Sequence, residues 1–219
     1  MEQLFKSLGK IFETDFINRC WIKTFPDGRQ EEYTLEDWHA EVAMARLNRQ
    51  VPEQIQEQFE TAKNVLLYSW FSYRLRMVAL LYSFSVVENA LRERLGYKRN
   101  DRRGLKRLLT EAIERRFLND SGFHIPKVKA TVVWEERRND GIVKKIEYSH
   151  IPEEDLKQSV EYIEGLCQAI PRLRNSLAHG KNCLFPEVLT PIIVHSEIIN
   201  MLFNTSSDGV VSAIDEEGK

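Results

Sequence analysis

A long stretch without proline or glycine dominates the sequence; it follows Pro52 and runs to Leu95. Because proline and glycine are the residues that most often end helices, their absence predicts either one very long helix or two helices separated by a break that composition does not reveal. The stretch is polar up to Lys63, whereas 65–91 is mostly apolar and aromatic. A helix that is apolar around most of its circumference is buried in a bundle or pressed against a partner chain. We therefore expect the core of a helical domain here, with a dimer face as the alternative.

The N-terminal part, 1–50, has a mixed pattern. Residues 21–34 predict two short extended pieces around a Pro-Asp-Gly turn. Thr34 has the position and chemistry of a helix N-cap, and Asp37 lies in the first turn of that helix. We therefore expect a mixed N-terminal segment, followed by a mainly α-helical domain over 51–203.

The middle of the domain is predicted to hold a helix and an inserted hairpin. Gly96 is a natural stop for the preceding helix, and the next helix is expected from about Leu105 to Leu118. Alternating β-branched residues at about 127–150 flank the sequence NDG, which is a strong turn signal. We interpret this segment as a β-hairpin inserted between helices.

A further helix is expected from Glu153 to His179. Its apolar positions recur at helical spacing, and Gly180 follows as a natural end. Pro171 lies inside this range, so the helix is expected either to kink or to restart there.

The last helix is predicted over 192–203. Thr190 and Pro191 precede it, and a Ser/Thr-type cap followed by proline is typical of a helix start. Residues 204–219 are small, polar and acidic, which is typical of a disordered tail.

The composition is that of a globular protein. Hydrophobic residues make up 42% and charged residues 29% of the 219-residue chain, which is enough for a sizeable core. With a net charge of −2, any affinity for nucleic acid must come from a local basic patch. No run of about 18 apolar residues occurs, so we expect no membrane-spanning helix. The cysteines are odd in number and widely spaced, at Cys20, Cys167 and Cys183, so we expect reduced thiols in a cytoplasmic protein.

Several common catalytic signatures are missing from the sequence. It contains no CxxC, HExxH, Walker-type loop, GxGxxG or GxSxG. The commonest zinc-site, nucleotide-binding and serine-hydrolase motifs are therefore excluded. We expect neither a metal nor a cofactor.

The candidate chemistry lies in the segment RLRNSLAHGK, at 172–181. Asn175 and His179 are four residues apart and share a helix face, whereas Arg174 lies about 140° around the axis from His179. A histidine that exchanges protons, together with an arginine that binds phosphate, supplies what RNA cleavage by attack of the 2′-hydroxyl needs. If two chains faced each other at this part of the helix, the combined site would contain more polar side chains than one copy provides. The alternative is an ordinary helix end with basic residues and a glycine cap.

A basic run offers candidate phosphate contacts. The segment 92–109 carries eight Lys/Arg residues against two acidic residues, and such a run attracts polyanions despite the negative net charge. The alternative is a solvated connector. The candidate substrate-binding residues in this region are Glu88, Arg92, Lys98, Arg99, Arg102 and Arg103. The aromatic residues considered for base stacking are Tyr97, Phe123 and Trp134.

The order Arg174-Asn175 and then His179-Gly180, late in a helical domain, resembles the motif of the HEPN superfamily (higher eukaryotes and prokaryotes nucleotide-binding). Members of that family carry an Arg, a following polar residue and a His four to six positions later on a late helix. Upstream, the segment SFSVVENALRERLG at 83–96 is similar to an earlier helix of abortive-infection-type members, which carries a Glu and an Arg one turn apart. The resemblance covers roughly 65–203.

The resemblance implies a dimerising bundle of four or five helices that acts as a metal-independent endoribonuclease in phage defence or as a toxin. It implies that Arg174 stabilises the phosphate, that His179 is the general base or acid, and that Asn175 orients the site. Glu88 would hold Arg174 or Arg92, with a plain surface ion pair to Arg92 as the alternative. The implied partners are RNA, a second copy of the chain, and an antitoxin or defence-system protein.

Two other functions are weighed against the nuclease. Pro171 departs from the family pattern, and some members keep the fold without activity, so a non-catalytic HEPN-like module that binds RNA, a nucleotide or a partner protein is the first alternative. The second is a helical interaction protein that uses its apolar helix as a partner surface, with 172–181 as an ordinary helix end.

Overall fold

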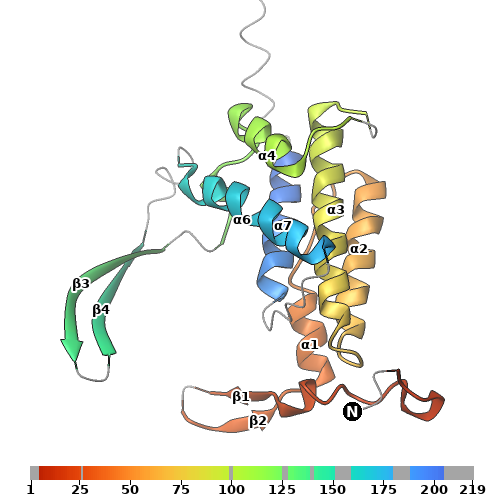
Figure 1. The fold of residues 1–219 in the computed structure, drawn as a ribbon, viewed down its shortest axis with the longest axis vertical. Coiled ribbons are helices and arrows are strands. Elements are labelled where there is room, and N and C mark those ends of the chain that lie inside the picture. Colours follow the sequence, from red (N-terminus) through yellow and green to blue (C-terminus); the bar gives the residue numbers. More distant parts are fainter. Residues whose placement is uncertain are drawn as a thin grey trace, which may run out of the picture.

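The computed structural model describes residues 5–25, 27–98, 101–124, 159–179 and 188–204, together with the backbone of two strands at 128–138 and 141–150. The expected tail beyond Asn204 lies outside these residues. The fold is mainly helical, as predicted (Figure 1). In chain order its elements are the 3-10 helices η1 (Leu8–Lys10) and η2 (Asn18–Cys20), β1 (Ile22–Thr24), β2 (Gln30–Glu32), α1 (Leu35–Val42), α2 (Glu53–Tyr68), α3 (Leu75–Leu95), α4 (Leu105–Glu114), η3 (Asp120–Gly122), β3 (Val128–Arg138), β4 (Gly141–His150), α6 (Glu161–Ala178) and α7 (Leu189–Leu202).

Helix α3 is the centre of the bundle. It packs against α2, α7, α4 and α6 (Figure 1), and its buried residues include Leu80, Phe84 and Leu91. The prediction that 65–91 supplies the core is confirmed, although Val78 remains half-exposed. Within the described residues, no helix combines the length and apolarity needed to cross a membrane.

The long stretch without proline or glycine forms two helices, and distant polar side chains stabilise the turn between them. The carboxylate of Asp15 accepts a hydrogen bond from the backbone N–H of Tyr73 at 2.8 Å. The amide of Asn18 donates to the carbonyls of Ser69 and Trp70, both at 2.9 Å. These bonds satisfy backbone groups that the interrupted helix leaves without partners. Because they come from far along the chain, local composition does not reveal the break.

Arg76, at the start of α3, lies in an aromatic cage. Its side chain is buried, and its guanidinium carbon lies 4.4–4.6 Å from the ring centroids of Trp21, Trp38 and Tyr73. It also donates to the side-chain oxygen of Asn18 at 3.2 Å. Cation–π contacts and this bond replace the lost hydration of the charge. The cage joins the N-terminal segment to the bundle.

The N-terminal segment is mixed, as predicted. Strands β1 and β2 pair antiparallel, with Ile22 opposite Glu32. Thr34 and Asp37 form a capping box at the start of α1: the Thr34 hydroxyl accepts from the Asp37 N–H, and the Asp37 carboxylate accepts from the Thr34 N–H at 2.9 Å. This arrangement satisfies two backbone donors at the helix start. Trp38 is the most buried of the large α1 side chains.

Helix α4 is shorter than predicted, because it ends at Glu114 and not near Leu118. Arg116 adopts a left-handed conformation with φ = 61°. The N–H of Phe117 then donates to the carbonyl of Ala112 at 2.9 Å. This closure is usually made by glycine, so no residue near 114 signals the end of the helix. Where glycine does occupy such a position, at the end of α3, the predicted stop is confirmed.

Helix α7 begins earlier than predicted, at Leu189 and not at Ile192. Val188 occupies the N-cap position, so the assignment of Thr190 as the cap was wrong. Pro191 lies inside the first turn. The first backbone N–H groups of a helix have no partner within it, so proline is accommodated there without loss of a hydrogen bond.

Helix α6 takes its N-terminal cap from a distant residue. The buried carboxylate of Asp120 accepts from the N–H groups of Tyr162 at 3.1 Å and Ile163 at 3.0 Å. The same carboxylate accepts from the Ser159 hydroxyl at 2.6 Å, and the Asp120 N–H donates to the Ser159 carbonyl at 3.0 Å. A carboxylate here satisfies unpaired donors and favours the positive end of the helix dipole.

The predicted helix from Glu153 is therefore corrected in part. Residues 151–158 lie outside the described part of the chain, and Ser159 and Val160 are not helical. From its start at Glu161 the helix continues through Pro171. It does not restart there.

The predicted hairpin is confirmed at the level of the backbone. Strands β3 and β4 pair antiparallel, with Val128 opposite His150 and Arg138 opposite Gly141. The pair extends away from the helices (Figure 1). Its turn, at 139–140, lies outside the described residues.

A buried histidine joins α3 to α7. His195 is 1% exposed, and its Nδ1 lies 2.8 Å from the hydroxyl of Ser83. That hydroxyl donates its single proton to the carbonyl of Leu80, so Nδ1 carries the proton and donates to Ser83. Burial lowers the pKa of His195 to about 3. The folded protein therefore contains the neutral imidazole.

This histidine makes stability depend on pH. Because the folded pKa is below the unfolded value of 6.5, the unfolded chain binds more protons between these values, and stability falls as pH drops through this window. We expect a contribution of at most about 1.4 kcal/mol per pH unit, lost in His195→Phe. Urea unfolding at pH 7 and pH 5 measures it. The control Ile199→Val, at another buried α7 position, should cost about 1 kcal/mol at both pH values. An unchanged pH dependence in His195→Phe would refute the assignment.

Candidate functional site

The late helix α6 crosses α3 (Figure 1) and brings Arg174 to Glu88. One terminal nitrogen of Arg174 lies 3.9 Å from Glu88 Oε2, and the other lies 3.3 Å from the side-chain oxygen of Asn175. The Arg174 side chain is 41% exposed. A guanidinium has five N–H donors, so these two contacts orient Arg174 and leave most of its donors facing solvent.

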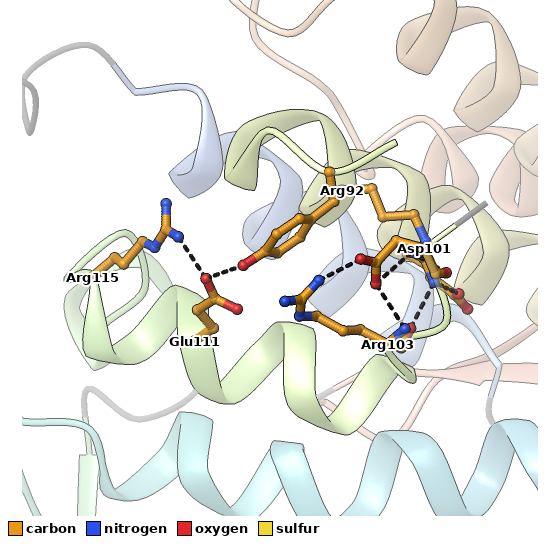
Figure 2. A network of polar contacts seen from close by, with 7 residues as sticks. Arg92, Asp101, Arg103, Glu111 and Arg115 are labelled. Carbon is orange, nitrogen blue, oxygen red and sulfur yellow. Dashed lines mark hydrogen bonds and ion pairs between the residues drawn. The ribbon is translucent and has the colours of Figure 1, made fainter. Parts of the chain in front are cut away.

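Glu88 joins this arginine to a second one. Arg92 donates to Glu88 Oε1 at 2.8 Å, and it also donates to the carbonyls of Asp101 at 2.8 Å and Arg103 at 2.6 Å (Figure 2). The Arg92 side chain is largely buried. Both expected contacts of Glu88 are therefore present, because it pairs with Arg92 and reaches Arg174. Arg92 itself is largely buried and donates to protein carbonyls, so it holds the surrounding loop and is not placed to contact a substrate.

His179 lies at the very end of α6. The helix ends at Ala178, and the N–H of His179 closes the last turn by donating to the carbonyl of Asn175 at 3.0 Å. The side chains of Asn175 and His179 are exposed. Within the described residues, no hydrogen bond or ion pair joins Arg174 to His179. Gly180, the predicted stop, lies outside these residues.

The predicted basic run is divided among three environments. Arg92 is buried, whereas Lys98 and Arg102 are exposed on the surface. Arg103 is partly buried: its guanidinium pairs with the carboxylate of Asp101 and lies 4.0 Å from the ring centroid of Tyr97. Arg99 lies outside the described residues.

A cavity of about 530 Å³ lies over α4. Its charged lining and one aromatic ring come from Arg103, Arg107, Glu111, Glu114, Arg115 and Tyr97. Neither Arg174 nor His179 lines it. Arg103 was named as a candidate substrate-binding residue and Arg107 belongs to the predicted basic run, whereas Glu111, Glu114 and Arg115 were not predicted. Arg107 and Glu111 lie one turn apart on α4, and Arg115 follows four residues later at its C-cap, so these three share one face. This spacing was the signal that sequence reasoning missed.

Glu111 orients two other side chains that line the cavity, Tyr97 and Arg115. Its Oε1 accepts from the hydroxyl of Tyr97 at 2.6 Å and from the guanidinium of Arg115 at 2.6 Å (Figure 2). The hydrogen bond from Tyr97 is the main cause that lowers the pKa of Glu111, and Arg115 lowers it further. The same bond raises the pKa of Tyr97. The carboxylate is therefore ionised and the phenol protonated at neutral pH.

The packing bears on two of the predicted stacking residues and overturns one. Phe123 is fully buried, and its ring centroid lies 5.0 Å from that of Tyr162. It belongs to the core, so its assignment to base stacking was wrong. Arg103 covers one face of Tyr97, which leaves at most one face free. The side chain of Trp134 lies outside the described residues.

Other sites and relatives add no further assignment. Among the described residues, no group of three or more His, Cys, Asp and Glu side chains is arranged to hold a metal ion. Comparisons with protein-family models, curated proteins and solved structures find no match to this chain.

The role of Arg92 predicts a large stability loss on its removal. In Arg92→Leu the Glu88 carboxylate and the carbonyls of Asp101 and Arg103 lose their donor, so we expect unfolding to become easier by about 3 kcal/mol. Urea denaturation measures this change. Arg102→Leu, an exposed arginine in the same loop, should change stability by about 0.5 kcal/mol or less. Equal effects of the two substitutions would contradict the structural role of Arg92.

Proposed function

We propose that this protein is a metal-independent endoribonuclease of the HEPN type that acts as a homodimer, in phage defence or as a toxin restrained by an antitoxin. One observation carries the proposal. Glu88, on α3, pairs with Arg92 at 2.8 Å and lies 3.9 Å from Arg174, on α6. The two sequence segments that resemble HEPN motifs, far apart in the chain, therefore meet at one point on the bundle.

The exposed side chains of Arg174 and His179 suit a reaction in which the RNA 2′-hydroxyl attacks the adjacent phosphate. Arg174, steadied by Glu88 and Asn175, would bind the phosphate and offset the charge that grows on it. His179 would accept the 2′-hydroxyl proton while the 2′-oxygen bonds to phosphorus. The bond from phosphorus to the 5′-oxygen breaks, and that oxygen takes a proton from a general acid. The products are a 2′,3′-cyclic phosphate and a free 5′-hydroxyl.

A dimer supplies what one copy lacks in this scheme. The reaction needs both a base and an acid, but each chain places one histidine, His179, at the end of α6. Arg174 and His179 also lie on different sides of the helix axis. Two α6 ends facing each other would provide two imidazoles and two guanidiniums in one cleft.

A non-catalytic RNA-binding module is the second candidate, and the position of the cavity favours it. The cavity with three arginines lies over α4 and is not lined by Arg174, Asn175 or His179. RNA binding that survives His179→Ala, with no cleavage by the wild type, would support this candidate.

The nuclease proposal predicts RNA cleavage in the presence of excess EDTA. We expect His179→Ala to slow cleavage about 100-fold or more, because a positioned acid or base contributes at least that much. Arg174→Ala should cost a similar factor through lost phosphate stabilisation. Cleavage of end-labelled RNA, followed on denaturing gels, measures both. His39→Ala, at an exposed histidine of α1, is the matched control and should cleave normally. Intact RNA with the wild type, or full activity in His179→Ala, would refute the proposal.

The proposed dimer predicts a solution mass of twice the 25.7 kDa chain. Light scattering coupled to size exclusion measures it at several protein concentrations. If the two copies share one cleft, inactive Arg174→Ala and His179→Ala chains should regain part of the activity when mixed and allowed to exchange subunits. A monomer at every concentration tested would contradict the shared site.

A further inference from the structure

The cavity over α4 has the features of a separate ligand site. Three arginines, Arg103, Arg107 and Arg115, line it. Arg107 is exposed, and its side chain has no hydrogen-bond or ion-pair partner among the described residues. A cation at a cavity wall that is not neutralised by its neighbours is available to an anionic ligand.

Two of the arginines are fixed before any ligand binds. Arg103 is held by Asp101 and by the ring of Tyr97, and its Nε is buried without a partner. Arg115 is held by Glu111, which the Tyr97 hydroxyl also orients. Each of these guanidiniums keeps donors that the protein does not use. Little side-chain entropy is therefore lost when a phosphate binds.

The carboxylates of Glu111 and Glu114 also line the cavity, so its ligand must suit acceptors as well as cations. An ionised carboxylate only accepts hydrogen bonds, and it repels a bare phosphate. A ligand that fits this lining carries an anionic group for the arginines and hydroxyl or amino donors for the carboxylates. A ribonucleotide unit has both, because its ribose 2′-hydroxyl donates and its phosphate is anionic.

We propose that the cavity over α4 binds one ribonucleotide unit of single-stranded RNA, with its phosphate on Arg103 and Arg107 and its hydroxyl donors on the carboxylates. The inference rests on the proposed function in taking RNA as the ligand. A chain of contacts links the two sites: Arg174 to Glu88, Glu88 to Arg92, and Arg92 to the carbonyl of Arg103. The strand held at the cavity therefore has a fixed position relative to Arg174.

The test is binding of a fluorescent single-stranded RNA, followed by anisotropy, in a His179→Ala background so that the probe is not cut. We expect Arg107→Gln to weaken binding about tenfold, as for loss of one charge-assisted contact. The slope of log K against log salt should fall by about 0.7, the value for one phosphate on a single strand. The matched control, Lys106→Gln, removes the same charge from the neighbouring residue of α4, which does not line the cavity. It should change affinity less than about twofold.

Two further probes distinguish the source of the phosphate. DNA of the same sequence should bind more weakly than RNA, and Glu114→Ala should reduce that difference, because the carboxylate no longer accepts from the 2′-hydroxyl. A nucleoside 5′-monophosphate should compete more weakly than RNA, because it lacks the neighbouring phosphates that a strand also brings to the protein. Equal losses in Arg107→Gln and Lys106→Gln would overturn the inference, since they would indicate a general charge effect. Competition by the monophosphate as strong as that of RNA would assign the cavity to free nucleotides and overturn the strand assignment.

The outcomes separate this inference from the nuclease proposal. Cleavage in EDTA with unchanged RNA affinity in Arg107→Gln would support the nuclease proposal and refute the cavity site. RNA binding that depends on Arg107, without cleavage by the wild type, would keep the cavity site and remove the nuclease. Circular dichroism checks that each variant is folded, which we expect because the Arg107 side chain is exposed and has no partner among the described residues.

Discussion

The buried guanidinium of Arg92 must have its charge and its donors satisfied inside the protein, and this requirement fixes much of the surrounding structure. Glu88 neutralises it from one turn earlier on α3, and the carbonyls of Asp101 and Arg103 accept its remaining bonds. An unpaired buried charge costs far more than the pair contributes. The loop before α4 is therefore held against α3, and Glu88 is held where it also reaches Arg174. Arg174, in the proposed catalytic site, and Arg103, in the lining of the cavity over α4, are thus both connected to Arg92.

Polar side chains from far along the chain satisfy backbone groups where helices begin and end. Asp15 and Asn18 satisfy the turn between α2 and α3. Asp120 caps α6. Each bond stabilises the end of a helix and also joins two distant segments. The bundle therefore depends on these buried polar contacts as well as on the apolar surface of α3.

This recurrence explains what could be predicted from the sequence. Features set by neighbouring residues were predicted correctly, such as the N-cap at Thr34, the stop at Gly96 and the hairpin. The start of α6 was not predicted correctly, and the break after α2 remained one of two alternatives, because distant side chains determine both. The end of α4 was missed because Arg116 adopts a conformation usually taken by glycine. In the candidate site, the contact between Glu88 and Arg174 was expected from the family resemblance. The charged face of α4 was not predicted, because its residue spacing belongs to no known motif.

The contact between Asp120 and Ser159 has a consequence for how the chain tolerates change. The inserted hairpin lies between these two residues in sequence, and their backbones and side chains are hydrogen-bonded to each other. The two ends of the insertion are therefore closed by the helical body itself, and the strands are not needed to bring them together. Segments of different length fit such a closed position at small entropic cost. A change in the length of the segment between Asp120 and Ser159 would therefore leave these closing contacts in place.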